Sequence, residues 1–296
     1  MRSIIVKAPA KVNLYLDVIN KRPDGYHNIE TIFERITLCD WIKVSLAKNN
    51  IKVVCSLKDI PVDNSNTAYK AARVLIQKYN LKCGFKIEID KRIPHAAGLG
   101  GGSSDAASVI LAINYLLGLK APKQTLMELA GKIGADVGFF ISELSRAIGS
   151  GIGNKLKQVK VREKMTFLVV SPGIKIPTFS VYASLLRFAR NDENIARLAL
   201  TKNELSANIS SPNSLIYNKF NINNILYNKL EDVVLPSYPV LGEIKKKLSA
   251  AGAEGVLVSG SGSGVYGIFR TRKEALRAKN KLMNKGKWQL FLANNY

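Results

Sequence analysis

Two hydrophobic periods alternate along this chain, and they indicate which segments form strands and which form helices. Near the amino terminus, short segments are apolar throughout or alternate between apolar and polar residues, as half-buried strands do. The strands expected there are residues 3–6, 12–18, 41–46, 51–55 and 85–89. Residues 67–79 instead carry apolar side chains at helical spacing, and Arg22-Pro-Asp-Gly25 is typical of a turn between two strands.

The rest of the chain mixes helices and strands without the regular alternation of a parallel sheet. The helices expected are residues 106–117, 123–133, 181–190, 241–251 and 272–284. The strands expected are residues 166–171, 256–259, 265–269 and 288–292. A glycine cluster at 149–153 favours a domain transition, and 296 residues are enough for two domains of about 150 each. The pattern predicts an α+β protein with domains 1–155 and 156–296.

Composition excludes several classes of protein. The longest apolar stretch is shorter than the roughly 18 residues that a membrane span needs, and the first residues lack the apolar core of a signal peptide. Three scattered cysteines without a CxxC pair argue against a disulfide framework and a zinc site, and favour reduced thiols in the cytoplasm. With only two histidines, a three-histidine metal site is impossible.

The charge balance is strongly basic, with 44 Lys and Arg against 22 Asp and Glu, a net charge of +22. Such a balance suggests an anionic partner, which could be nucleic acid, a membrane surface or a phosphorylated small molecule. A general compositional bias toward lysine explains it equally well. Helix-turn-helix, zinc-finger and aromatic RNA-binding patterns are absent from the sequence, which disfavours a nucleic-acid-binding protein.

The segment 94–107, Pro-His-Ala-Ala-Gly-Leu-Gly-Gly-Gly-Ser-Ser-Asp-Ala-Ala, carries the strongest candidate chemistry. Glycines let the backbone approach a ligand closely, and the helix expected after them, with residues 103–105 as its N-cap, adds unpaired N–H donors. This combination predicts a phosphate-binding loop; a glycine-rich loop without a ligand is the alternative. A Walker A motif is absent, and the glycines at 262, 264 and 267 precede a strand, unlike a dinucleotide fingerprint.

Two other motifs place a single charge among apolar residues. Lys11 begins an apolar strand and could extend into a cleft, although a lysine in this position more often lies on the surface. Asp136 is bracketed by Gly134 and Gly138, and a buried carboxylate requires a partner. Lys11 would supply that partner; a helix-capping role for Asp136 is the alternative.

In chain order, these motifs resemble those of the GHMP kinases, which are named for galactokinase and the homoserine, mevalonate and phosphomevalonate kinases. The phosphate loop and a second glycine run at 259–269 carry the resemblance, which extends from residue 4 to about residue 270. Segments 9–14, 22–27, 134–140 and 172–178 more closely resemble the branch of this family that phosphorylates a cytidine diphosphate derivative of methylerythritol.

The resemblance implies a two-domain GHMP kinase fold with the active site in the cleft between the domains. It implies an ATP-dependent kinase that transfers a phosphoryl group to an alcohol, the 2-hydroxyl of the substrate. Asp136 would act as base or charge stabiliser, with Lys11 orienting it. ATP would bind through Pro94, Gly98, Leu99, Gly100, Gly101, Gly102, Ser103 and Ser104, with Asn66 near the adenine. Mg²⁺ would accompany ATP, and its ligands stay open.

On the acceptor side, the resemblance implies that Asn13 binds the erythritol and that Thr178 contacts the substrate. Tyr26, His27 and Tyr182 would hold the cytosine, with the two tyrosine rings facing each other and His27 reading the edge of the base.

The expected partner is therefore a small cytidine diphosphate compound, without nucleic acid or membrane, bound by a cytoplasmic monomer or weak homodimer. The alternatives are another small-molecule kinase of the same superfamily or a basic nucleic-acid-binding protein. The sequence departs from the expected family pattern at Asn154, where a glutamate is expected, and at Ser259, where a threonine is expected.

Overall fold

The structure is a computed structural model, which describes residues 2–160, 163–188, 225–283 and 287–296. The strands of its larger sheet are β1 (Ser3–Lys21), β2 (His27–Ala47), β3 (Ile51–Cys55), β4 (Gly84–Asp90), β5 (Arg146–Ser150), β6 (Lys155–Gln158) and β8 (Tyr227–Asn228). The strands of its smaller sheet are β7 (Thr166–Ser171), β9 (Gly255–Val258), β10 (Val265–Phe269) and β11 (Gln289–Asn294). The helices are α1 (Thr67–Tyr79), α2 (Gly101–Leu116), α3 (Lys123–Gly131), α4 (Val137–Ser142), α5 (Thr178–Phe188), α7 (Glu231–Ser237), α8 (Pro239–Ala250) and α9 (Arg272–Met283).

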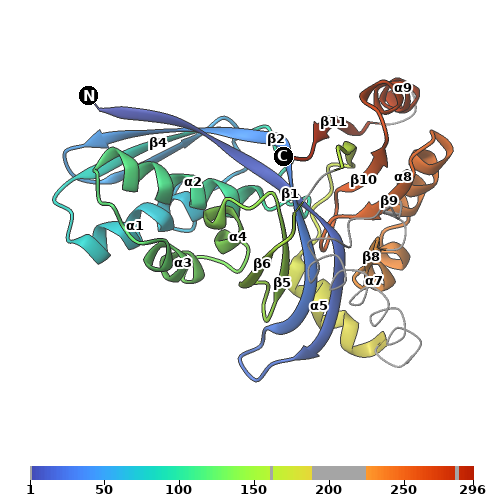
Figure 1. Ribbon diagram of the computed structural model, residues 1–296, viewed down its shortest axis with the longest axis horizontal. Helices are drawn as coiled ribbons and strands as arrows, with labels where there is room; N and C mark the ends of the chain where they lie inside the picture. Colours follow the sequence, from blue (N-terminus) through green and yellow to red (C-terminus); the bar gives the residue numbers. More distant parts are fainter. Residues whose placement is uncertain (1, 161–162, 189–224, 284–286) are drawn as a thin grey trace, which may run out of the picture.

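The two sheets divide the described residues into two halves (Figure 1). In the larger sheet the strand order is β3-β4-β2-β1-β8, with β5 paired to β2 and β6 paired to β5. In the smaller sheet the order is β11-β7-β10-β9. Because β6 and β8 still pair in the larger sheet, the chain passes between the halves more than once; the domain boundary after residue 155 stays a prediction.

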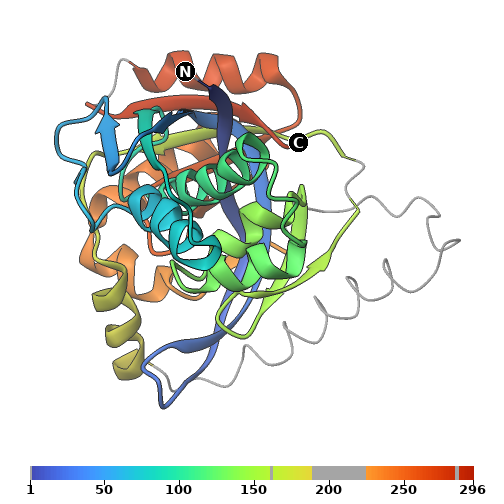
Figure 2. The ribbon, with the colours of Figure 1, turned by 90° about the vertical axis from the view of Figure 1, so that its left-hand side faces the viewer.

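The hairpin of β1 and β2 is the longest feature of the fold. The short strands expected at 3–6, 12–18 and 41–46 are parts of these two continuous strands, which bulge after Pro9, Asn13 and Val18. A bulge accommodates Pro9, which has no N–H to donate to a ladder. The turn is confirmed at 22–26, where Arg22 N donates to Tyr26 O at 2.8 Å. Both views place the tip of the hairpin beside α5 (Figures 1 and 2).

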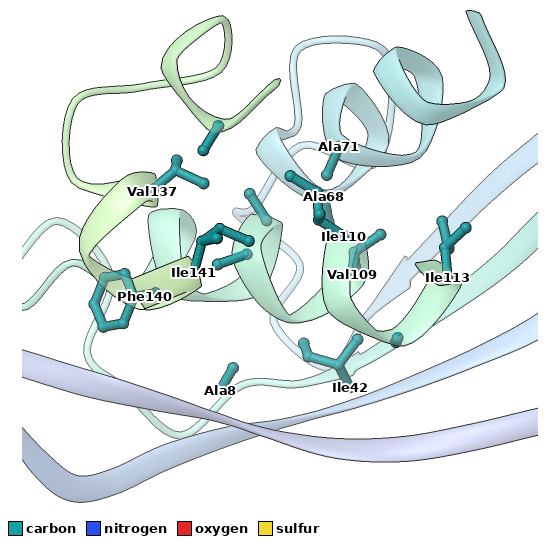
Figure 3. Packing of buried hydrophobic residues seen from close by; sticks show 14 of the residues in the cluster. Ala8, Ile42, Ala68, Ala71, Val109, Ile110, Ile113, Val137, Phe140 and Ile141 are labelled. Atoms are coloured by element: carbon teal, nitrogen blue, oxygen red, sulfur yellow. The ribbon is translucent and has the colours of Figure 1, made fainter. Parts of the chain in front are cut away.

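Helix α2 is the centre of the largest core. Its Val109 and Ile110 are fully buried against Ala68 and Ala71 of α1, while Ile42 approaches from the sheet (Figure 3). Alanines on α1 allow the two helix backbones to approach closely, so that α2 is covered on most of its sides. This burial stabilises a helix whose first residues, Gly101 and Gly102, are poor helix formers.

A second core joins the two sheets. Val12 and Leu14 of β1 are fully buried with Phe167 of β7 and Tyr266 of β10. The Tyr266 hydroxyl also donates to Asn13 O at 2.8 Å. The middle of β1 is thereby fixed against the smaller sheet. Lys11 and Asn13, the residues of β1 for which candidate chemistry was expected, lie next to these buried residues.

Several expected boundaries are wrong, and the largest error concerns the phosphate loop. The helix expected to begin at residue 106 begins at Gly101, with Gly100 at the N-cap position and no side-chain cap. Residues 103–105 therefore lie in its first turns and do not form the cap. Helix α5 begins at Thr178, and residues 189 and 190 of the expected helix lie outside the described residues, as does residue 284 of the last helix.

Helices α4 and α7 and strands β5, β6 and β8 were not expected from the sequence. They are short, and short segments carry too few residues to establish a period. The helix over 67–79 and the strands over 166–171 and 265–269 are confirmed at the expected residues. None of the described helices is long and apolar enough to cross a membrane.

Candidate active site

Lys11 and Asp136 form the ion pair expected from the sequence. Lys11 Nζ, from the middle of β1, lies 3.5 Å from Asp136 Oδ2, which immediately precedes α4. The Lys11 side chain is 5% exposed and that of Asp136 is 30% exposed. A surface role for Lys11 is therefore wrong, as is capping by Asp136, whose side chain makes no cap hydrogen bond. The lysine lies beneath a carboxylate that solvent, or a ligand, can reach.

A buried hydrogen-bond network orients Lys11. Its ammonium donates to Asn13 Oδ1 at 2.6 Å, and Asn13 Nδ2 donates to Thr31 Oγ1 at 2.7 Å. The Thr31 hydroxyl donates in turn to Tyr15 O at 2.7 Å. Because the Thr31 proton is committed to Tyr15, its oxygen can only accept from Asn13, and the amide of Asn13 has one orientation. A role for Asn13 toward the erythritol stays a prediction.

The phosphate loop lies directly beside this network. Lys11 N donates to Leu99 O at 3.0 Å, and Gly100 has a φ of +70°. A Cβ on Gly100 would lie 3.0 Å from Lys11 Cγ and from Phe140 Cζ. Glycine is needed here both for the left-handed backbone and for the close approach of Lys11. Leu99 is buried, so its contribution to a ligand can come only from its backbone.

A further glycine run, residues 259–264, packs against the phosphate loop. We call it the third glycine segment, because it follows the phosphate loop and the glycine cluster at 149–153 along the chain. Ser259 Oγ donates to Gly98 O at 2.9 Å, and Gly264 N donates to Ala97 O at 3.1 Å. A Cβ on Gly98 would lie 1.9 Å from Ser259 O. Gly98 is thus required by contact between two loops. The candidate site forms where the two sheets meet, because each contributes one of these loops.

A triad of charged residues that the sequence did not indicate joins the two ends of the phosphate loop. Lys91 Nζ, at the end of β4, lies 2.6 Å from Asp40 Oδ2 and 2.7 Å from Asp105 Oδ2. Asp40 Oδ1 also accepts from the N–H groups of Arg92 and Ile93. Burial favours a lower pKa for Lys91, but the two carboxylates outweigh it and hold the pKa above its ordinary value. The triad ties α2 to the strand ends that precede the loop.

Asn66 occupies the N-cap of α1, beside the phosphate loop. Its Oδ1 accepts from Ala68 N at 2.8 Å, and its Nδ2 donates to Pro61 O at 2.6 Å. The neighbouring Thr67 hydroxyl donates to Gly102 O at 2.7 Å, which brings the start of α1 against the start of α2. The side chain of Asn66 is therefore committed to capping, and its proximity to adenine stays a prediction.

An aromatic pair lies at the tip of the hairpin. The rings of His27 and Tyr182 have centroids 5.1 Å apart and are tilted by 34°. Tyr26, which was expected to face Tyr182, is 57% exposed. His27 Nε2 is buried and has no partner among the described residues. Burial and, secondarily, the charge of Lys21 lower the pKa of His27, so the imidazole is neutral at neutral pH.

The substrate contact predicted for Thr178 lies at the start of α5. Its hydroxyl is 2.9 Å from Ser261 Oγ, in the third glycine segment. The structure therefore brings Lys11, Asn13, Asp136 and Gly100 together at one point and connects Thr178 to the same loop system.

Comparison with known proteins agrees with this geometry. Residues 66–143 match the model of the GHMP kinases N terminal domain, and residues 212–287 match that of GHMP kinases C terminal. The chain is 41% identical over 290 residues to the 4-diphosphocytidyl-2-C-methyl-D-erythritol kinase of Geobacter metallireducens, covering 97% of both chains. It belongs to this kinase family. A relative of the same name from Acetivibrio thermocellus is 38% identical over 295 residues, 99% of each chain.

Solved structures of the GHMP kinases confirm the predicted fold. The crystal structure of a 4-(cytidine 5'-diphospho)-2C-methyl-D-erythritol kinase matches with a TM-score of 0.77 at 31% identity, over 99% of this chain and 100% of that one. A homoserine kinase from Cytophaga hutchinsonii matches with a TM-score of 0.75 at 17% identity, over 100% and 95%, which shows the shared fold alone. The α+β class and the two-domain GHMP fold are thus established for this family member.

One departure from the expected family pattern is compatible with the site. Ser259 stands where a threonine was expected, and its hydroxyl still makes the hydrogen bond to Gly98 O that joins the two loops. A threonine hydroxyl has the same donor capacity, so the exchange preserves this contact.

Proposed function

We propose that this protein transfers the γ-phosphoryl group of ATP to the 2-hydroxyl of 4-diphosphocytidyl-2-C-methyl-D-erythritol. The observation that carries the proposal is the Lys11–Asp136 pair, 3.5 Å apart, in which the backbone N–H of Lys11 also bonds Leu99 O of the phosphate loop. It occurs in a chain that is similar over nearly its whole length to kinases named for that substrate.

The ion pair would act on the acceptor hydroxyl. Phosphoryl transfer depends on in-line positioning and charge stabilisation more than on covalent chemistry. The exposed face of the Asp136 carboxylate can accept the hydroxyl proton or stabilise the charge that develops as the oxygen attacks. Lys11, held by Asn13, fixes the carboxylate and balances its charge. Both roles require the two groups to stay in register with the phosphate loop.

ATP would bind by its phosphates at the start of α2. The first amides of a helix have no partner within the helix, and with the loop before them they form an anion site. Ser103 and Ser104 lie in this first turn, and Ser104 Oγ is buried without a partner among the described residues. The Ser104 hydroxyl is thus a donor in this turn that no described residue uses.

Mg²⁺ would enter with ATP. Among the described residues, no group of three or more His, Cys, Asp or Glu side chains could hold a metal by itself. That suits Mg²⁺, which is usually held by one or two carboxylates together with the substrate phosphates. The partly exposed Asp136 carboxylate is one oxygen donor of this kind beside the phosphate loop. Once bound, the ion neutralises charge on the phosphates.

A panel of acceptors tests this proposal. ADP formation would be measured with the cytidine diphosphate substrate, its uridine analogue, methylerythritol phosphate, mevalonate and homoserine. We expect kcat/KM for the cytidine compound to exceed that for each other acceptor by about 100-fold or more. An analogue that lacks a hydrogen-bonding group of the substrate leaves the polar groups of the site unpaired, and this penalty makes the site reject it. Equal turnover of mevalonate or homoserine would contradict the proposal and favour another GHMP kinase.

The aromatic pair predicts how the base is held. Tyr182→Ala should raise KM for the cytidine substrate by about 5–150-fold, because stacking on an aromatic ring contributes about 1–3 kcal/mol per base. KM for ATP should stay unchanged.

Tyr26→Ala is the matched comparison: Tyr26 is 57% exposed, so we expect a smaller rise in KM for the cytidine substrate. His27→Ala should reduce discrimination between the cytidine and uridine compounds, since His27 Nε2 has no hydrogen-bond partner among the described residues and is the atom that would bond the base edge. An unchanged KM in Tyr182→Ala would place the base elsewhere.

A further inference from the structure

Asn228 connects the two halves of the molecule through its side chain. Its backbone is part of β8, where it pairs with Leu16 of β1 in the larger sheet. Its side chain crosses to the smaller sheet, where Nδ2 donates to Val258 O at 2.9 Å and to Gly260 O at 2.8 Å. Asn228 is 3% exposed. These two carbonyls flank Ser259, so the amide of Asn228 holds the point at which β9 leads into the third glycine segment.

The accepting oxygen of Asn228 is also committed. Asn228 Oδ1 accepts from Leu230 N at 3.0 Å. An asparagine amide offers two donors and one acceptor group in a single plane, and here all three are used. An aspartate of the same shape would keep the acceptor and lose both donors, which would leave a carboxylate facing two carbonyl oxygens.

The backbone that Asn228 holds lies against the reacting groups. Gly260 has a φ of +55°, and a Cβ there would lie 3.5 Å from Asn13 Oδ1 and 3.6 Å from Lys11 Nζ. The same segment donates hydrogen bonds to the phosphate loop through Ser259 Oγ and Gly264 N. A shift of this segment would therefore be transmitted through the phosphate loop to Lys11, whose backbone N–H donates to Leu99 O at 3.0 Å.

Glu231 reinforces the same point of the chain. Its Oε1 accepts from Val258 N at 2.8 Å, while its Oε2 pairs with Lys245 Nζ of α8. Both backbone groups of Val258 are thus bonded to side chains of residues 228–231. This short segment fixes the end of β9 more tightly than the sheet alone would.

We propose that Asn228 is a positioning residue for phosphoryl transfer: by bonding Val258 O and Gly260 O it holds the third glycine segment against the phosphate loop, and so keeps the ion pair in register with that loop. The inference rests on the proposed function only for the choice of acceptor. Misplacement of reacting groups by about 1 Å can cost on the order of 100-fold in rate.

Asn228→Asp and Asn228→Ala test the proposal against Val233→Ala, which trims a buried core residue of α7 in the same part of the fold. We expect both Asn228 variants to lower kcat by about 10–100-fold, a larger factor than the rise in KM for either ATP or the acceptor. Val233→Ala should lower the melting temperature and leave kcat unchanged. Hydrogen exchange of the backbone amides in 258–264 should accelerate in the Asn228 variants alone.

The outcomes separate this inference from the proposed function. If the wild-type protein prefers another acceptor of the panel, the proposed substrate fails, and the ratio of variant to wild-type kcat is measured with that acceptor. The exchange measurement needs no acceptor. Unchanged kcat with unchanged exchange would overturn the positioning role, as would a loss of activity no greater than that of Val233→Ala. Unfolding of both Asn228 variants would overturn it too, since it would assign Asn228 to overall stability.

Discussion

Asp136→Asn is expected to lower kcat by about 10²–10⁴-fold, the range that general-base and charge-stabilising groups contribute. The substitution preserves the shape of the side chain and removes its charge and its capacity to take a proton. Asp136 is 30% exposed, and its ion pair with Lys11 is long at 3.5 Å, so the fold should survive. ATP affinity should stay close to that of the wild type, because the phosphate loop is unchanged. Steady-state kinetics together with nucleotide titration measure both.

The matched control is Asp90→Asn. Asp90 also forms an ion pair, with Arg92 Nη2 at 2.8 Å, but both side chains are more than half exposed. Exposed pairs contribute at most about 1 kcal/mol, so this variant should behave as the wild type. A kcat for Asp136→Asn within about threefold of the control would remove Asp136 from the chemistry.

Lys11→Met is expected to lower kcat more than it raises either KM, and to reduce stability as well. The side chain is 5% exposed, and its loss leaves Asn13 Oδ1 without its donor and Asp136 without its counter-charge. Removing one partner of a fully buried ion pair costs about 3–5 kcal/mol. Because Asp136 retains contact with solvent, we expect a loss no greater than about 3 kcal/mol. Kinetics and thermal unfolding followed by circular dichroism measure the two effects.

Lys11→Arg separates charge from shape. It keeps the positive charge, but a planar guanidinium cannot occupy the position of a compact ammonium between Asn13 and Asp136. We expect it to restore stability in part and activity very little. A folded Lys11→Met enzyme with wild-type kcat would show that the lysine takes no part in orienting Asp136.

The sequence alone determined the features whose physical cause is local. Residues 67–79 form a helix because apolar side chains recur at helical spacing behind a capping Asn66. The phosphate loop could be predicted because glycines and a following helix make an anion site without help from the rest of the chain. The Lys11–Asp136 pair followed from one general rule, that a carboxylate among apolar residues needs a partner.

Which distant residues share these sites depends on how the two sheets pack together. Tyr26 and His27 are adjacent, and which ring meets Tyr182 depends on the position of the hairpin tip beside α5. Asn228 carries no sequence signal, because a single asparagine in a short strand has no period and no motif. Its importance comes from two carbonyls some thirty residues away, at Val258 and Gly260, which β8 and β9 bring within hydrogen-bond distance. Long-range contacts of this kind arise when two sheets pack, and the local propensities of the residues do not predict that packing.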